Sequence, residues 1–234
     1  MNKLFAGASL ALILLAACGP TPATDAAPVA APEAAAAPTP ITIASPAGAY
    51  VSDPNHASVS FKLQHLGLAF YSMKFKTFDA TVNFDPANIS ASSVTATIKS
   101  SDILAGYPGD YVASHAGTKF TSWEDDLANS TNFLDAGQHP TITFVSTSVE
   151  PSGERTAKVT GDLTLKGVTR PVTLDVTFAG ESASHPFSKV PAIGFSATGT
   201  FKRSDFGLDY LLPSIVGDEV HVEIEGDFLQ KPAA

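Results

Sequence analysis

Short runs in which apolar and polar residues alternate make up most of the chain. In residues 57–64, for example, Ala57, Val59, Phe61 and Leu63 alternate with serine, lysine and glutamine. A period of two predicts a β-strand with one apolar and one wet face, and many such strands predict an antiparallel sheet buried on one side. Eight runs have this pattern: residues 57–64, 78–84, 94–98, 142–144, 159–165, 172–178, 193–199 and 220–225.

Eight strands without a long helix leave two architectures, a sandwich of two sheets or a closed barrel. Residues 166–171 predict a hairpin connection between two strong strands. The alternation of apolar and polar residues is interrupted between residues 102 and 134, where Ser122 and Trp123 precede the acidic run 124–126. A serine N-cap followed by acids in the first turn favours a short helix. We expect this helix to plug or flank one end of the sheet.

The apolar faces of the strands are rich in phenylalanine and carry small residues among the large ones. The small residues are Ala80, Ala96, Gly161, Ala197 and Gly199. One interpretation is a core filled by its own side chains. The other is a lumen left partly open for an apolar ligand. The pattern alone favours the filled core, because packed cores are commoner than ligand cavities.

The first 47 residues have a different composition and predict a targeting signal followed by a linker. Residues 1–17 combine one lysine with an apolar run that suits a secretory signal peptide and is too short to span a bilayer. The tetrapeptide 15–18 (LAAC) resembles the bacterial lipobox, which implies cleavage before Cys18 and acylation of its thiol and amino group. A chance cysteine after an ordinary signal is the alternative. Residues 18–47, rich in alanine, proline and threonine, predict a semi-rigid linker.

The lipobox resemblance implies a location as well. A domain over residues 48–230 would be held by acylated Cys18 at the periplasmic face of the bacterial cell envelope, without spanning a membrane. Gly19, rather than an aspartate, follows the cysteine, which by analogy with bacterial sorting favours the outer membrane.

Composition and charge exclude several classes of protein. One cysteine in 234 residues cannot form an intramolecular disulfide, a CxxC redox pair or a thiolate zinc site. A net charge of −9 gives no electrostatic reason to bind nucleic acid. The six histidines show no metal-ligand spacing, the acids 124–126 lack the spacing of a calcium loop, and no GxSxG elbow or phosphate loop is present. We therefore expect no metal, no cofactor and no catalytic residues.

Several segments resemble the YceI-like domain family of polyisoprenoid-binding periplasmic proteins, in the right order across residues 49–229. The segments that carry the resemblance are 50–61 (YVSDPNHASVSF), 65–67 (HLG), 75–85, 132–135 (NFLD), 139–144 (HPTITF), 161–172 (GDLTLKGVTRPV), 203–207 (RSDFG) and 217–220 (GDEV). One stretch departs from the family. Where the family has Arg-Asp-x-His-Leu, this chain has residues 124–128 (EDDLA), without the arginine or the histidine.

The resemblance implies a lipocalin-like, antiparallel eight-stranded barrel with a long apolar tunnel. The tunnel would hold a polyisoprenoid or a similar long lipid, for example an isoprenoid quinone or its precursor, for binding, transport or storage without catalysis. Under this interpretation the small inner residues make room for a branched tail. The missing arginine and histidine would alter which head group is accepted.

The alternation places a specific set of side chains on the inner face, and we expect this set to line the lumen. It comprises Phe61, Leu63, His65, Phe78, Val82, Phe84, Ile98, Ile142, Phe144, Leu163, Leu165, Leu174, Val176, Phe178, Phe195 and Ala197. His65 has two possible roles, in satisfying a strand end or in touching a ligand head group. Two other functions remain open: an envelope interaction module with a filled core, and an enzyme acting on a lipid head group.

Overall fold

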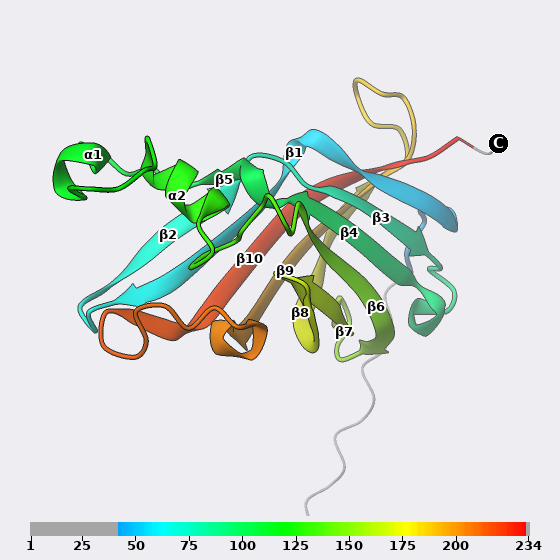
Figure 1. Cartoon of the computed structure of the whole chain (residues 1–234). Helices are drawn as coiled ribbons and strands as arrows, with labels where there is room; N and C mark the ends of the chain where they lie inside the picture. Colours follow the sequence, from blue (N-terminus) through cyan, green and yellow to red (C-terminus); the bar gives the residue numbers. More distant parts are fainter. Residues whose placement is uncertain (1–41, 233–234) are drawn as a thin grey trace, which may run out of the picture. The chain divides into compact units, whose positions relative to one another are not determined.

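Each of the eight predicted runs corresponds to a strand of one closed antiparallel barrel in the computed structural model, which describes residues 42–232 (Figure 1). Only the run 78–84 begins outside its strand, because Phe78 lies one residue before it. Around the barrel the strands follow the order β1-β3-β4-β6-β7-β8-β9-β10, and β10 pairs with β1 to close it. The predicted lipocalin-like barrel is therefore confirmed. The strand bounds are β1 (Gly48–His65), β2 (Ala69–Phe75), β3 (Asp79–Phe84), β4 (Ser93–Lys99), β5 (Ile103–Leu104), β6 (Thr141–Pro151), β7 (Thr156–Leu165), β8 (Val168–Ser182), β9 (Ala192–Lys202) and β10 (Val216–Gln230).

The connection between β7 and β8 is a two-residue hairpin turn. Leu165 pairs with Val168, and the residues between them, Lys166 and Gly167, have φ values of 50° and 75°. Two successive positive φ values define the turn type whose twist matches that of the flanking strands, and glycine adopts such a φ without strain. The predicted hairpin connection is confirmed, but it is shorter than the expected 166–171, because residues 168–171 already belong to β8.

Strand β1 bends and changes its partner half-way along. Its first residues, 48–51, pair with β3, whereas residues 59–65 pair with β2, and a register shift between Ser52 and Ala57 separates the two halves. Strand β2 in turn pairs with the short β5. The alternation did not predict β2, because Phe70 puts a large apolar side chain on its exposed face and obscures the period of two.

Two short helices occupy the irregular segment between β5 and β6. Helix α1 spans Tyr111–Ser114 and helix α2 spans Trp123–Asn129. Ser122 caps α2 by accepting a hydrogen bond from the amide of Asp125 at 3.1 Å, so the predicted helix start is confirmed. The described residues also contain three 3₁₀ turns, at Ile89–Ala91, Ser100–Asp102 and Arg203–Phe206. None of the helices within residues 42–232 is long and apolar enough to cross a membrane.

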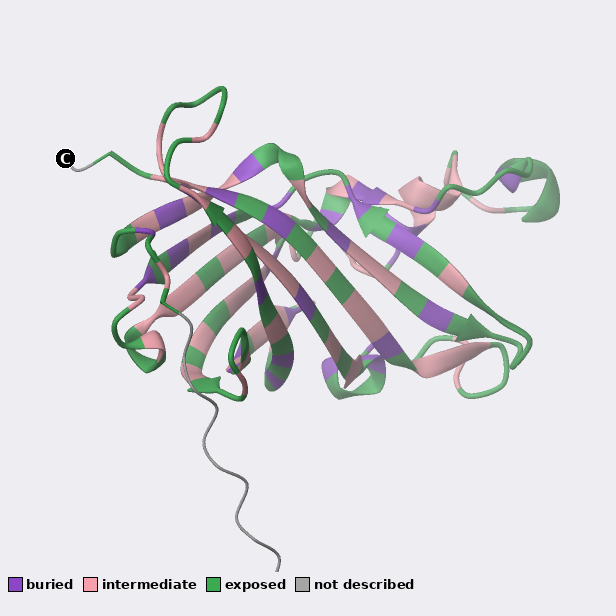
Figure 2. Cartoon of the chain, turned by 180° about the vertical axis from the view of Figure 1, so that it is seen from behind, coloured by how far each residue is buried: buried purple, intermediate pink, exposed green. Residues whose placement is uncertain are grey.

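Buried and exposed residues alternate along the strands, as Figure 2 shows. One half of the barrel interior is filled by aromatic side chains from Tyr50, Phe84, Phe178, Phe195 and Phe228. Their ring centroids lie 5.7–6.2 Å apart, mostly in edge-to-face arrangements. We call these five residues the aromatic plug. It makes this half of the barrel a packed core.

Two of the small inner-face residues, Gly161 and Gly199, do not leave open space beside them. A methyl group added at Gly161 would meet the ring of Phe144, and one added at Gly199 would lie 2.6 Å from a methyl carbon of Leu174. These glycines therefore receive the larger side chains of neighbouring strands, and at these positions the expectation of room for a branched tail is wrong.

Residues 44–46, just before β1, are held to the barrel by hydrogen bonds. The backbone amides of Ala44 and Ser45 donate to the carboxylate of Glu181 at 3.0 and 2.6 Å, and the hydroxyl of Tyr50 donates to the carbonyl of Pro46 at 2.7 Å. The signal peptide predicted at 1–17, Cys18 and the linker up to residue 41 lie outside the described residues.

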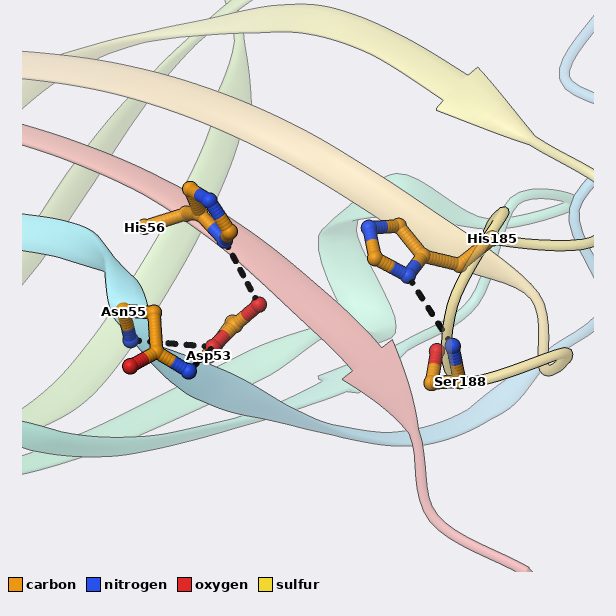
Figure 3. A network of polar contacts seen from close by, with 5 residues as sticks. All are labelled: Asp53, Asn55, His56, His185 and Ser188. Carbon is orange, nitrogen blue, oxygen red and sulfur yellow. Dashed lines mark hydrogen bonds and ion pairs between the residues drawn. The ribbon is translucent and has the colours of Figure 1, made fainter.

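A charged pair occupies the bend of β1, within the register shift between Ser52 and Ala57 (Figure 3). Buried Asp53 accepts hydrogen bonds from the amide of Asn55 at 2.9 Å and contacts Nδ1 of His56 at 2.8 Å. The bond to His56 is the main cause that lowers the pKa of Asp53, and the same bond is the main cause that raises the pKa of His56. Figure 3 also shows His185, which accepts the amide of Ser188 within the β8–β9 loop.

This pair predicts a pH-dependent contribution to stability. A lowered Asp53 pKa stabilises the fold above the ordinary value of 3.8, and a raised His56 pKa stabilises it below the ordinary value of 6.5. Both contributions are present at about pH 4–6.5, and the histidine contribution is lost as the pH rises through its raised value. We expect His56→Gln to lower the free energy of unfolding more at pH 5.5 than at pH 8.0, as measured by urea denaturation. In an Asp53→Asn background this difference should shrink, and its persistence would contradict the pairing.

Candidate ligand-binding cavity

A cavity of about 630 Å³ occupies the half of the barrel away from the aromatic plug. This volume falls within the range of about 300–1,000 Å³ that is usual for small-molecule sites. Its walls come from β1, β2, β7 and β10, the ends of β4, β6 and β9, helix α2 and the loop before β10, whereas β3 and β8 contribute none. Nearly all of the lining side chains are aliphatic or aromatic.

The structure divides the predicted lumen residues into two sets. Seven line the cavity: Phe61, Leu63, His65, Ile98, Ile142, Leu163 and Leu165. Nine do not line it and instead pack within the barrel wall and core of the other half: Phe78, Val82, Phe84, Phe144, Leu174, Val176, Phe178, Phe195 and Ala197. The cavity is thus confined to one half of the barrel, where the sequence had predicted a lining along the whole inner face.

An aromatic wall lines the cavity on the side of the two helices. The ring centroids of Tyr111 and Trp123 lie 5.7 Å apart, those of Trp123 and Phe133 lie 5.5 Å apart, and those of Phe133 and Tyr210 lie 5.5 Å apart. His115 stacks on Tyr111 at 4.3 Å. The four members His115, Trp123, Phe133 and Tyr210 line the cavity. The wall therefore joins three irregular segments into one apolar surface.

A buried cation lies beside the cavity. Arg203, only 6% exposed, is among the lining residues. Its guanidinium donates to the carbonyls of Leu208 at 2.7 Å, Gly217 at 2.9 Å and Val216 at 3.0 Å. Burial lowers the pKa of Arg203, while the charges of Asp218 and Asp209 act in the opposite direction. Because an arginine stays protonated, the loop before β10 is organised around a full positive charge.

The sequence matches the YceI-like domain family over residues 50–228, which is the barrel just described. The chain belongs to this family. A UPF0312 protein from Pseudomonas savastanoi pv. phaseolicola is 37% identical over 179 residues, which are 76% of this chain and 85% of that relative.

Solved structures have the same fold. BcnA from Burkholderia cenocepacia is 28% identical, with a TM-score of 0.60 over 73% of this chain and 95% of that chain. A polyisoprenoid binding domain from Saccharophagus degradans, described as implicated in plant cell wall breakdown, has a TM-score of 0.56 over 79% of this chain and 99% of its own. At 11% identity, the second likeness shows the fold alone.

In this YceI-like domain the departing stretch 124–128 has a structural role. Glu124 accepts the backbone amides of Ala105 and Gly106 at 3.1 and 3.2 Å, which fixes α2 to the segment after β5. Burial alone would raise the pKa of Glu124, but the backbone hydrogen bonds outweigh it and the pKa is lowered. Asp126 accepts the hydroxyl of Tyr111 at 2.5 Å and so orients one ring of the aromatic wall.

Polar groups at the cavity are few. His65 is the last residue of β1 and also lines the cavity, so its position fits both of the roles expected for it. The hydroxyl of Tyr71 donates to the carbonyl of Ala105 at 2.8 Å and is thereby satisfied within the protein. Within residues 42–232, no three His, Cys, Asp or Glu side chains gather as metal ligands.

Sequence reasoning missed the cavity residues that belong to irregular segments. His115, Trp123, Phe133, Arg203 and Tyr210 follow no period of two, so the strand pattern gives no information about them. The available signal was the gathering of aromatic residues in segment 107–133, outside any strand. Loops that are placed by a rigid barrel are where binding residues commonly lie.

Proposed function

We propose that this protein binds the tail of a polyisoprenoid, or of a similar long apolar lipid such as an isoprenoid quinone or its precursor, without chemical change to it. The observation that carries the proposal is the cavity of about 630 Å³ walled by apolar side chains. The fold that the chain shares with a polyisoprenoid binding domain is compatible with the same ligand class. An open cavity argues against the alternative of an interaction module with a fully packed core.

The physical basis of the proposal is burial of the tail away from water. Each methylene group transferred from water into the cavity returns about 0.8 kcal/mol. Leu163, Phe61 and Val222 are only partly buried by protein and line the cavity, so a ligand would cover surface that the barrel itself leaves uncovered. Shape and dryness, rather than many polar contacts, would then determine affinity.

Filling the cavity should abolish lipid retention. Leu163→Trp adds an indole to a side chain that already lines the cavity, so we expect the amount of lipid recovered by organic extraction of the purified protein to fall at least tenfold. Native mass spectrometry should show the same loss as a missing mass increment on the folded protein.

Val145→Trp is the matched control. Val145 lies on β6, pairs with the neighbour of Leu163, and is exposed on the outer face. This variant should retain lipid as the unmodified protein does. Equal loading of Leu163→Trp and Val145→Trp would refute a ligand in the cavity.

We further propose that acylated Cys18 anchors the protein at the periplasmic face of the bacterial outer membrane. The tetrapeptide 15–18 and Gly19 support this location. Metabolic labelling with radioactive palmitate should label the protein, and Cys18→Ser should abolish the label and release the protein from the membrane fraction. Retention of the label in Cys18→Ser would contradict the proposal.

A further inference from the structure

Exposed apolar side chains border the open end of the cavity on three separate segments. They are Leu66 and Leu68 in the β1–β2 turn, Tyr107 and Val112 at α1, and Tyr210 and Ile215 before β10. We call these six residues the mouth rim. Figure 1 shows the three segments at the same end of the barrel. Tyr107, Tyr210 and Ile215 also line the cavity, so the rim and the cavity wall form one continuous apolar surface.

The exposed apolar residues are unevenly distributed over the molecule. Among the described residues, nine large apolar side chains are exposed, and the six rim residues together with Phe70 on adjacent β2 account for seven of them. The other two, Val145 and Phe187, lie on the outer face of β6 and in the β8–β9 loop. Single exposed apolar residues need no explanation, but a gathered set marks an interaction surface.

The charge around the rim favours a bilayer as the partner. Two of the three rim segments, residues 63–73 and 210–217, contain no Asp, Glu, Lys or Arg, although the chain carries a net charge of −9, and the third carries the single charge of Asp110 between Tyr107 and Val112. The amide of Leu66 donates to the carbonyl of Ile215 at 2.8 Å, which joins these two uncharged segments into one surface. A protein partner is usually met by a rim of polar and charged residues, whereas insertion between lipid head groups is driven by the burial of exposed apolar side chains.

We propose that the mouth rim inserts into the surface of a phospholipid bilayer and that the cavity exchanges its lipid with the bilayer through this end. The inference rests on the proposed function, because a lipid that resides in a bilayer must reach the cavity. Passage across a docked rim keeps the tail away from water throughout. Since the protein is acidic, docking on zwitterionic lipid should exceed docking on anionic lipid.

The test uses zwitterionic phosphatidylcholine vesicles that contain a fluorescent polyprenol. The full chain carries Cys18→Ser in every variant, so residues 1–41 contribute equally throughout. The rim variant is Leu68→Ser with Val112→Ser, which changes two exposed residues that do not line the cavity. The control is Phe187→Ser, because Phe187 is as exposed as Leu68, 85% against 84%, but lies in the β8–β9 loop. Binding of dispersed farnesol, which needs no vesicle, reports on the cavity alone.

In the rim variant we expect vesicle binding and the rate of polyprenol transfer to fall about tenfold, while the affinity for farnesol stays unchanged. The control should behave as the parent protein. Equal losses in Phe187→Ser, or unchanged transfer in the rim variant, would overturn the inference. Dimers that dissociate in the rim variant, without vesicle binding by the parent, would overturn it in favour of a second copy on the rim. Farnesol binding without vesicle binding overturns the inference alone, whereas vesicle binding without farnesol binding overturns the proposed function and supports docking.

Discussion

Phe178→Ala is expected to lower the free energy of unfolding by about 3–5 kcal/mol and to leave lipid binding in the folded protein unchanged. Phe178 is buried in the aromatic plug, with its ring centroid 6.2 Å from that of Phe84 and 5.7 Å from that of Phe195. Arg155 covers the same ring, with its guanidinium carbon 5.1 Å from the centroid. Removal of the ring leaves a void within a packed core that cannot collapse fully. Urea denaturation measures the loss.

Phe61→Ala is the matched comparison, because Phe61 also sits on an inner face but lines the cavity. Its ring stacks on Phe75 at 5.5 Å and is only partly buried. We expect a smaller loss of stability than for Phe178→Ala and a faster release of bound lipid. If Phe178→Ala lost lipid while remaining stable, the aromatic plug would have to be part of the binding site.

Alternation predicted the eight strands that close the barrel and which way their side chains point, but not β2 or β5. The seven cavity-lining residues that were expected, such as Leu163 and Ile142, do face inward. A period of two is a property of each strand by itself, so it can be read without knowledge of the neighbouring strands.

The height of a residue along the barrel could not be predicted in this way. Phe144 and Ile142 point to the same side of β6, yet Ile142 lines the cavity and Phe144 covers Gly161. Strands tilt across a barrel, so the level that a residue reaches depends on the stagger between strands. That stagger is set by pairings such as Val145 with Asp162 and by the register shift after Ser146, which involve two strands together.

The aromatic wall of the cavity could not be predicted from the sequence for a different reason. Tyr210 lies far from Trp123 and Phe133 in the sequence, and the contacts between the three rings exist only once α2 and the loop before β10 are in place. The sequence predicted the helix from Ser122 and the acids after it, but it did not show which surface the helix covers. Such contacts between irregular segments produce no periodic pattern of apolar residues in the sequence.

Arg203→Met is expected to destabilise the protein by about 3–5 kcal/mol and to speed the release of bound lipid. Three carbonyl groups, those of Leu208, Val216 and Gly217, accept from the guanidinium, and methionine offers no donor to any of them. A buried carbonyl left without a partner costs about 1–3 kcal/mol. The same carbonyls fix the loop that holds Tyr210 at the cavity mouth, so its loosening should raise the dissociation rate. Urea denaturation and stopped-flow displacement of a fluorescent polyprenol measure the two effects.

Two further variants separate the hydrogen bonds from the charge. Arg203→Lys keeps the charge but replaces the planar fork with a single ammonium, so we expect it to recover only part of the lost stability. Lys202→Met removes a charge from the adjacent exposed position and should change stability by less than about 0.5 kcal/mol. If Lys202→Met and Arg203→Met had equal effects, net charge would govern this end of the barrel. A loss confined to position 203 would show that the guanidinium acts through the three carbonyls, which hold the loop before β10 in its position at the cavity mouth.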